Sequence, residues 1–451
     1  MSKKLPTVAI VGRANAGKSS VFNRLIQEKR AIVAREAGTT RDSVIGRVEL
    51  DNQAFLVVDT AGLKVAEDEF EASIQDQIAD AIDAASAILL VVDRTEYPDD
   101  ELKSIAKKAL KSQKLVFLVL NKSDLKDALP SDEFLRLGIK DIFTVSAEHN
   151  HGFDRIIEKL ATNLPKVRGD KLDPNAIKVS LIGRPNVGKS NLFNTLAGKQ
   201  QAIVAPVAGT TRDVNRVKIR YDGKEIELLD TAGVRRSGKI EKGIEKFSVL
   251  RTLMAIEESD ICLLLMDVNE LNTGLDQKLA GQIADAGKGL IIVVSKWDSV
   301  EGKDAYTRDA LAPQIAAMFD FVPWAPLIFT SSVTGKNVTK ILELVKQVNV
   351  ERHREIKTRK LNDLLQRAIM KHPPAGLKNT HPKFRYIVQT DTSPPWFVIY
   401  GSHFKFIHWS YKRYLERQFR EEFNFVGTPI KFSFRDEKQI KANREKEKSG
   451  A

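Results

Sequence analysis

The chain has 451 residues, of which 42% are hydrophobic and 29% are charged. This composition is typical of a folded globular protein and too apolar for a disordered one, and the length suffices for about three domains. The sequence has no apolar run of the roughly 18 residues that a membrane-spanning helix needs, and its start, MSKKLPTVAI, has no signal-peptide core. The only cysteine, Cys262, lies in the apolar run ICLLLM, which excludes an internal disulfide and predicts a buried thiol. We therefore expect a cytoplasmic protein.

The net charge of +12 is concentrated at the C-terminal end. Residues 1–351 hold 49 Lys and Arg against 49 Asp and Glu, whereas residues 352–451 hold 22 against 10, so the last hundred residues carry the whole excess (22 − 10 = 12). This distribution indicates an anionic partner for the C-terminal third. A solvated basic face and tail without such a partner is the alternative.

Apolar, β-branched runs alternate with helical patterns through most of the chain. Runs without polar alternation predict strands buried on both faces of a mostly parallel sheet, with helices in βαβ units around it. In chain order they are TVAIVG, AFLVVD, AILLVVD, LVFLVL and IFTVS, then IKVSLIG, IELLD, ICLLLMD, LIIVVS and PLIFTS.

The second group of runs copies the first. Gly183 follows Gly12 by 171 residues, and Asp230 follows Asp59 by the same 171 residues. This period is far too long for a solenoid repeat and indicates a duplicated domain. The predicted organisation is a first α/β domain at 1–164, a linker at 165–175, a second such domain at 176–351, a basic domain at 352–437 and a disordered tail at 438–451.

The sequence G-x-x-x-x-G-K-S occurs in both copies, each time after a strand and before a helix. In this context the glycines let backbone N–H groups surround phosphate oxygens at a helix N-terminus. The Lys side chains, Lys18 and Lys189, can reach the β- and γ-phosphates, and the Ser hydroxyls can ligate Mg²⁺. The two loops comprise Gly12, Arg13, Ala14, Asn15, Ala16, Gly17, Lys18 and Ser19, and Gly183, Arg184, Pro185, Asn186, Val187, Gly188, Lys189 and Ser190.

Two further motifs recur in order, AGTTRD at 37–42 and 208–213 and DTAG at 59–62 and 230–233. The AGTTRD hydroxyls are placed to detect a γ-phosphate and its metal. The DTAG carboxylate can hold the Mg²⁺ shell through water, and its Gly N–H can contact the γ-phosphate. With the residue that follows DTAG, the predicted site residues are Asp59, Thr60, Ala61, Gly62 and Leu63, and Asp230, Thr231, Ala232, Gly233 and Val234.

The motifs NKSD at 121–124 and SKWD at 295–298 predict guanine recognition. A carboxylate at this place accepts hydrogen bonds from guanine N1–H and its exocyclic amine, a donor pattern that adenine lacks, so the prediction is GTP and not ATP. VSA at 145–147 and TSS at 330–332 offer a backbone N–H to the guanine oxygen. The predicted base-binding residues are Asn121, Lys122, Ser123, Asp124, Ser146 and Ala147, and Ser295, Lys296, Trp297, Asp298, Ser331 and Ser332.

The motif set GRxNxGKS, GTTRD, DTAG, N/S-K-x-D and SA/SS, present twice, resembles the double-Era-like GTPases of bacteria, the Der or EngA family. The C-terminal segments HPPAGLK, PPWFVIYG, HWSYKRYLERQFREEFNF and GTPIKFSFR extend the resemblance over nearly the whole chain. It implies an α/β fold of two tandem P-loop GTPase domains with doubly wound sheets, plus a C-terminal α+β KH-like domain.

The same resemblance implies a monomeric, ribosome-associated switch that hydrolyses GTP, assists assembly of the large ribosomal subunit and contacts its RNA. An Era-like GTPase subunit of an RNA-modification complex is the alternative. The residues that the family resemblance implies for catalysis are Lys18, Lys189, Asp59, Asp230, Thr40 and Thr211, and those that it implies for Mg²⁺ binding are Ser19, Thr40, Ser190 and Thr211. It also implies that Lys122 and Lys296 pack along the base.

The residue after DTAG is apolar in both copies, Leu63 and Val234, so it cannot orient water as the Gln of Ras-like GTPases does. Relatives with this substitution can use K⁺, held in part by the phosphate-loop Asn, here Asn15 and Asn186. A fixed cation would stabilise developing charge as an arginine finger does. The alternative is that both Asn side chains only cap the turn.

The basic third predicts the order helix, strand, strand, helix, strand, which resembles a KH-like domain. It lacks the GXXG loop with which KH modules clamp single strands. The helical spacing of Lys412, Arg413, Arg417 and Arg420 predicts a basic stripe. The aromatic side chains of Trp396, Trp409, Tyr411 and Phe419 are predicted to belong to the core.

Two differences between the copies bear on nucleotide binding. Pro185 pre-sets the φ angle of the second phosphate loop where the first has Ala14, so the first loop is expected to be less preorganised. Ser295 stands where the first copy has Asn121. Asn can reach both guanine N7 and the phosphate loop, whereas Ser is expected to reach only one, so weaker nucleotide binding is predicted for the second site.

Overall fold

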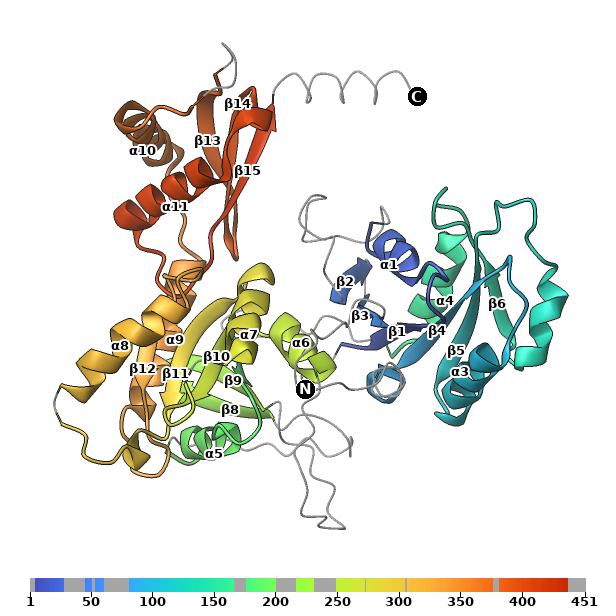
Figure 1. The fold of residues 1–451 in the computed structure, drawn as a ribbon, viewed down its shortest axis with the longest axis horizontal. Coiled ribbons are helices and arrows are strands. Elements are labelled where there is room, and N and C mark those ends of the chain that lie inside the picture. Colours follow the sequence, from blue (N-terminus) through green and yellow to red (C-terminus); the bar gives the residue numbers. More distant parts are fainter. Residues whose placement is uncertain are drawn as a thin grey trace. The chain divides into compact units, whose positions relative to one another are not determined.

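The computed structural model describes residues 5–27, 45–50, 53–60, 81–165, 176–199, 216–230, 249–271, 273–304, 306–375 and 381–436. It separates into two compact units, Met1–Pro174 with Ser248–Met254 and Asn175–Phe247 with Ala255–Ala451 (Figure 1). No helix within the described ranges is both long and apolar enough to cross a membrane.

The first unit contains a six-stranded sheet in the order β2-β3-β1-β4-β5-β6. All described pairings in it are parallel except the edge pair β2–β3, so the prediction of a mostly parallel, doubly wound sheet is confirmed. Its strands are β1 (Thr7–Val11), β2 (Ile45–Leu50), β3 (Gln53–Asp59), β4 (Ala87–Asp93), β5 (Leu115–Asn121) and β6 (Asp141–Thr144). The helical segments are α1 (Lys18–Gln27), α3 (Asp100–Lys111), the 3₁₀ segment η2 (Ser131–Leu137) and α4 (Phe153–Asn163).

Both faces of this sheet are buried, which is why its strands read as continuous apolar runs. Along β1, Val8 and Ile10 belong to a core cluster shared with α1 and α4, whereas Ala9 and Val11 belong to a second cluster shared with α3. Successive side chains of a strand point to opposite faces, so α1 and α4 cover one face and α3 the other.

The second unit repeats this architecture in the order β12-β11-β10-β7-β9-β8, the same arrangement of equivalent strands. The core side chains of β7 alternate in the same way, and those at Val179 and Leu181 pack with α5 and α9. The strands are β7 (Ile177–Ile182), β8 (Arg216–Tyr221), β9 (Lys224–Asp230), β10 (Ile261–Asp267), β11 (Gly289–Ser295) and β12 (Leu327–Phe329). The helical segments are α5 (Lys189–Lys199), α7 (Gly274–Asp285), η3 (Trp297–Ser299), α8 (Thr307–Met318) and α9 (Val338–Arg352). Helix α6 (Val249–Glu258) is divided between the units, because its residues up to Met254 belong to the first.

The C-terminal part of this unit forms a three-stranded sheet, β13-β14-β15, in which β13 pairs antiparallel and β14–β15 pair parallel. Helices α10 and α11 share one core with the sheet, which contains Leu365, Phe397, Leu415 and Phe419. The predicted αββαβ order is confirmed. The elements are α10 (Thr358–Lys371), β13 (Lys383–Thr392), β14 (Pro395–Ser402), η4 (Phe404–Phe406), α11 (Trp409–Phe423) and β15 (Lys431–Asp436).

Backbone hydrogen bonds join this C-terminal part to the second GTPase-type sheet. Leu290 N–H at the start of β11 donates to Gly427 O over 2.8 Å, and Gly427 N–H donates to Trp324 O over 2.8 Å. The guanidinium of Arg352, 3% exposed, donates to Gly287 O at 2.7 Å. The two domains of this unit are therefore bonded at the amino end of β11, whereas Ser295 lies at its carboxyl end.

All ten predicted strands are present, and two more, β2 and β8, were not predicted. Their sequences, IGRVEL and RVKIRY, carry charged residues between apolar ones because each is an antiparallel edge strand. The prediction for Cys262 is confirmed. Its side chain is fully buried, and burial raises the pKa of the thiol although Ser180 and Ser259 hydrogen-bond to it.

Candidate nucleotide-binding sites

Both phosphate loops connect a central strand to a helix that begins at the motif Lys. Gly12 has φ +151°, and a Cβ on it would lie 2.2 Å from Val91 O. Gly183 has φ +149°, and a Cβ there would lie 2.5 Å from Leu265 O. The first glycine of each loop is therefore required, because any side chain would overlap the backbone of the neighbouring strand.

The two Lys side chains occupy equivalent positions over their loops. Lys18 Nζ donates to Gly12 O at 3.0 Å and to Arg13 O at 2.5 Å, and Lys189 Nζ donates to Gly183 O and Arg184 O at the same two distances. Both side chains are about nine-tenths buried. Burial lowers the pKa of Lys18, an effect that the charges of Asp59 and Glu101 oppose. Each ammonium therefore directs two of its N–H groups at carbonyls of its own phosphate loop.

The first copy presents an oxygen pair suited to Mg²⁺. Ser19 Oγ donates to Asp59 Oδ2 at 2.6 Å, where the loop-following helix meets the end of β3. A hydroxyl and a carboxylate are hard oxygen donors, and Mg²⁺ usually takes only one or two protein ligands beside phosphates and water. Among the described residues, no group of three or more His, Cys, Asp or Glu side chains is placed to hold a metal ion.

The guanine motif of the first copy lines a cavity of about 430 Å³. Asn121 Nδ2 donates to Ala16 O in the phosphate loop at 3.1 Å, and its Oδ1 accepts from Ala147 N–H at 3.1 Å. A hydrogen bond from Ser146 lowers the pKa of the Asp124 carboxyl, which keeps it ionised as an acceptor for guanine. The cavity is lined by Gly17, Ser20, Asn23, Arg24, Asn121, Lys122, Asp124, Leu125, Ala147 and Glu148.

In the second copy the shorter Ser295 still reaches the phosphate loop. Its hydroxyl lies 2.6 Å from Val187 O and 2.9 Å from Met266 O, both of which accept. Ser295 therefore reproduces the tie that Asn121 makes to the loop. Because a hydroxyl has a single hydrogen, which these carbonyls occupy, it has none to donate to guanine N7. Trp297 packs edge-on against Phe329, with ring centroids 4.8 Å apart.

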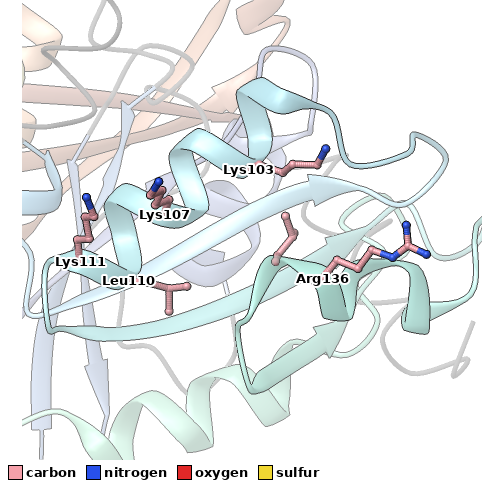
Figure 2. Close-up of a pocket in the computed structure, with 6 residues that line it drawn as sticks. Lys103, Lys107, Leu110, Lys111 and Arg136 are labelled. Carbon is pink, nitrogen blue, oxygen red and sulfur yellow. The ribbon is translucent and has the colours of Figure 1, made fainter.

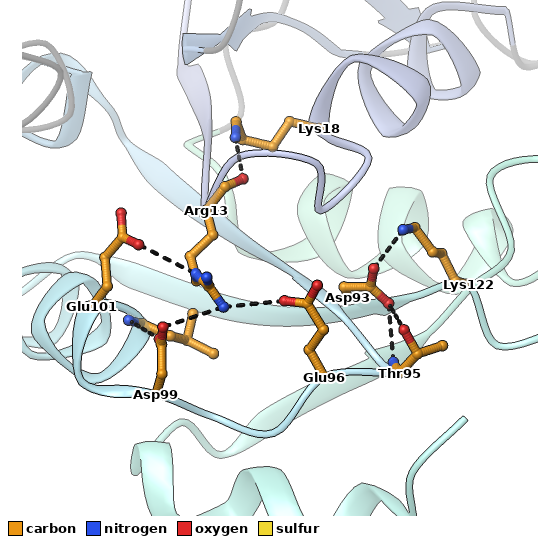
Figure 3. Close-up of polar contacts among 9 residues, drawn as sticks. Arg13, Lys18, Asp93, Thr95, Glu96, Asp99, Glu101 and Lys122 are labelled. Atoms are coloured by element: carbon orange, nitrogen blue, oxygen red, sulfur yellow. Dashed lines mark hydrogen bonds and ion pairs between the residues drawn. The ribbon is translucent and has the colours of Figure 1, made fainter. Parts of the chain in front are cut away.

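The Lys of each guanine motif pairs with the carboxylate that ends the neighbouring strand. Lys122 hydrogen-bonds to Asp93 (Figure 3), and Lys296 Nζ lies 2.7 Å from Asp267 Oδ2. Burial alone would raise the pKa of Asp93, but hydrogen bonds from Lys122 and Thr95 hold it below its ordinary value. The packing of these lysines along a base stays a prediction.

Part of the predicted sites lies outside the described residues, as does the side chain of Asp230. Asn15 and Asn186 are described and have φ of 62° and 63°, a left-handed conformation that Asn tolerates well. A residue that tolerates this conformation is needed in the turn whether or not the Asn side chain also binds K⁺. The residues outside the description are Thr40, Ala61, Gly62, Leu63, Thr211, Thr231, Ala232, Gly233 and Val234.

One supporting residue was not predicted from the sequence. Arg24 lies on α1, six positions after Lys18, and its guanidinium donates to Ala147 O at 2.6 Å and to Glu148 O at 2.8 Å. Thr195 has the same place on α5, and its hydroxyl lies 3.2 Å from Ser332 O and 2.8 Å from Asn191 O, two carbonyls that share its single hydrogen. Each helix therefore anchors the loop that closes the base pocket. No local motif marks these positions, since the residue types differ.

Two predictions for the basic third are wrong in part. Tyr411 and Phe419 are core residues as predicted, but Trp409 is 59% exposed, with the Arg413 guanidinium 4.8 Å above its ring. Arg420 does not belong to an exposed stripe. Its side chain is 12% exposed and donates to Thr428 O at 3.1 Å, because α11 turns this position toward Trp324 of the neighbouring domain.

The repeated sheet order, the two phosphate loops and the two guanine motifs define a protein with tandem P-loop GTPase domains. A family model described as "50S ribosome-binding GTPase" matches residues 7–122 and 178–296. A second, described as "KH-domain-like of EngA bacterial GTPase enzymes, C-terminal", matches residues 355–435.

Relatives match over nearly the whole length. GTPase Der of Thermomicrobium roseum is 40% identical over 459 residues, covering 99% of both chains. GTPase Der of Herpetosiphon aurantiacus is 40% identical over 448 residues, covering 96% of this chain and 98% of its own. Among solved structures, a variant of Aquifex aeolicus Era bound to GDP and AlF4⁻ is 21% identical and covers 58% of this chain and 93% of its own, with a TM-score of 0.30. The chain belongs to the GTPase Der family and is a GTPase.

Proposed function

We propose that this GTPase is a cytoplasmic, monomeric switch that associates with the ribosome and assists assembly of its large subunit. The observation that carries the proposal is the union, in one chain, of two complete phosphate loops with a C-terminal third that holds 22 basic against 10 acidic residues. GTP hydrolysis supplies a directional change of state, and the basic third supplies attraction to RNA phosphates. The family model described as ribosome-binding supports this reading.

In the proposed cycle, Lys18 and Lys189 hold the β- and γ-phosphates from their positions over the two phosphate loops. Ser19 and Asp59 hold Mg²⁺ in the first site, with Ser190 and Asp230 in the same roles in the second. The ion would neutralise charge on the phosphates. Asp124 and Asp298 read guanine, and K⁺ beside Asn15 and Asn186 assists hydrolysis in place of a catalytic Gln. Thr40 and Thr211 detect the γ-phosphate.

A cationic groove on the first GTPase domain is a second surface for RNA. Figure 2 shows Lys103, Lys107 and Lys111 along α3, with Arg136 of η2 below the Lys103 end of the helix and Leu110 below the Lys107–Lys111 end. They border a cavity of about 430 Å³ that contains no predicted nucleotide-site residue. A phosphodiester backbone has the charge to match these side chains, and contacts of this kind weaken steeply with salt.

The experiment is sedimentation of the full-length protein with purified large subunits in GTP, GDP or a non-hydrolysable GTP analogue. Binding that depends on the GTP form supports the switch, and equal binding with all three nucleotides contradicts it. Lys107→Glu tests the groove, and Lys340→Glu, an equal change of charge at an exposed position on α9, is the matched control. Unchanged binding of the groove variant, at several salt concentrations, would remove the groove from the proposal.

A further inference from the structure

Arg13, the second residue of the first phosphate loop, forms ion pairs with three carboxylates. Arg13 Nη1 lies 3.1 Å from Glu96 Oε2 and 3.2 Å from Asp99 Oδ2, and its Nε lies 3.2 Å from Glu101 Oε2 (Figure 3). All three acids belong to residues 93–101, the brace segment of the first copy, which connects β4 to α3. Asp99 also caps α3, since its Oδ1 accepts from Leu102 N–H at 2.9 Å.

The second copy makes the same kind of contact from residues 267–271 and 273–276, its own brace segment. Arg184 Nη1 lies 3.0 Å from Glu270 Oε2, its Nη2 donates to Glu270 O at 2.8 Å, and its Nε lies 3.2 Å from Asp276 Oδ2. Asp276 belongs to the first turn of α7, where the Thr273 hydroxyl donates to it at 2.8 Å. Two domains that differ in most residues thus keep a guanidinium on the same loop position.

Some of the acids that contact Arg13 and Arg184 occupy equivalent positions in the two copies, and others do not. Glu270 follows Glu96 by 174 residues, the same offset that separates Ser295 from Asn121, so these acids are equivalent. The remaining acids differ in position, Asp99 at the cap of α3 and Asp276 within the first turn of α7. A contact rebuilt with different residues indicates that the tie itself is needed, and not one particular side chain.

We infer that Arg13 and Arg184 are positioning residues for nucleotide binding, because they brace each phosphate loop against the segment that also holds the guanine-motif Lys. The carbonyl of Arg13 is one of the two that accept from Lys18 Nζ. The other end of the same brace segment holds Lys122 through Asp93. A single segment therefore fixes both the phosphate-binding and the base-binding loops before nucleotide arrives, which lowers the ordering cost of binding.

The two braces differ in exposure. The Arg13 side chain is 33% exposed, and its three acids are 42–59% exposed. In the second copy Arg184 is 13% exposed; its partner Glu270 is 70% exposed, whereas Asp276 is fully buried, so the Arg184–Asp276 pair is the buried part of this brace. Exposed ion pairs are screened by salt, whereas buried pairs are screened much less. The first brace should therefore weaken as ionic strength rises, and the second should persist.

The first test measures the Kd of a fluorescent GDP analogue at the first site of the full-length chain, with the second site silenced by Lys189→Ala in every variant. Arg13→Gln should weaken binding about fivefold at low salt, as expected for the loss of several exposed ion pairs, with partial recovery in Arg13→Lys. The melting temperature should change little, because all partners of Arg13 are hydrated.

Variants of the acids that contact Arg13 distinguish positioning of the phosphate loop from direct attraction between Arg13 and the phosphates. Glu96→Gln/Glu101→Gln removes the tie but leaves the positive Arg13 beside the phosphates. The brace requires weaker GDP binding in this variant too. Tighter binding would show that Arg13 acts only as a charge near the phosphates, and an unchanged Kd in both variants would show that the contact is dispensable; either result overturns the inference.

The second test compares the two copies in salt. The ratio of variant to parent Kd for Arg13→Gln should fall toward one by about 0.5 M KCl, where screening acts over only a few ångströms. In a Lys18→Ala background, Arg184→Gln/Asp276→Asn should keep its loss of affinity over the same range; the paired change avoids leaving Asp276 buried without its counter-ion. The same salt dependence in both copies would refute the assignment of one exposed and one buried brace.

Discussion

Replacing Ser295 by Asn tests how the second site reads its base. The Ser295 hydroxyl has one hydrogen and lies on two backbone carbonyls, at 2.6 Å and 2.9 Å. In the first copy one N–H of the Asn121 amide donates to Ala16 O, and the same nitrogen carries a second N–H. Ser295→Asn should therefore keep the tie to the phosphate loop and add one donor for guanine N7.

The site has room for the larger side chain. A Cβ on Gly17 would lie 2.2 Å from Asn121 Nδ2, so the Asn amide packs directly over that glycine. At the equivalent Gly188 the nearest atom, Ser295 Oγ, is 3.9 Å from the Cβ position. The glycine is already present in the second copy, and the space that an Asn amide needs above it is open.

One added hydrogen bond is worth about 0.5–1.5 kcal/mol, which corresponds to roughly two- to tenfold tighter binding. The assay is titration of GDP into the full-length chain with the first site silenced by Lys18→Ala, before and after Ser295→Asn. Asn121→Ser, measured with the second site silenced, is the mirror variant and should weaken binding by a similar factor.

Repeating both titrations with 7-deaza-GDP, which lacks the N7 acceptor, isolates the contact. The gain from Ser295→Asn should disappear with this analogue. No gain with GDP, or an equal gain with GDP and 7-deaza-GDP, would refute the reasoning, because the added N–H would then not reach N7.

Three further predictions concern hydrolysis, the domain boundary and pH. Turnover of GTP should be faster in KCl than in NaCl at equal ionic strength, and equal rates would exclude the K⁺ role. Gly427→Ala should lower the free energy of unfolding by at least about 2 kcal/mol in denaturant titrations, because Gly427 has φ +68° and the added Cβ would lie 2.2 Å from Val348 Cγ2. Gly223→Ala is the control and should lower it less, because Gly223 has a similar φ of +77° but open space around the Cβ position. Burial raises the pKa of Tyr411 to about 12, so the unfolded chain releases this proton from about pH 10 while the folded chain keeps it. The free energy of unfolding should therefore fall as pH rises from 10 to 12. This fall should be on the order of 1 kcal/mol larger in the parent than in Tyr411→Phe. At neutral pH the variant loses only the hydrogen bond from Tyr411 to His372 O at 2.8 Å.

The sequence determined the parts of this protein whose physics is local. A phosphate loop needs glycines, Lys and Ser at fixed spacing between a strand and a helix, so both loops can be recognised without a structure. Strands buried on both faces must be continuously apolar, which revealed ten of the twelve strands of the two GTPase sheets. The duplication follows from motif offsets alone, and the excess of basic residues at the C-terminal end from a count.

The tertiary structure decided which distant residues meet. Arg13 and its acids are 83 to 88 residues apart, and Arg24 lies 123 residues from the carbonyl that it holds. No sequence period encodes such pairs, because they depend on how strands β1, β4 and β5 are ordered in the sheet. The same reason accounts for Arg420, whose helical spacing suggested an exposed stripe but whose side chain faces the neighbouring domain, and for Trp409, an aromatic residue that the fold leaves in solvent. Spacing along the chain thus identifies the chemistry of each loop, and the order of the strands decides what holds that loop in place.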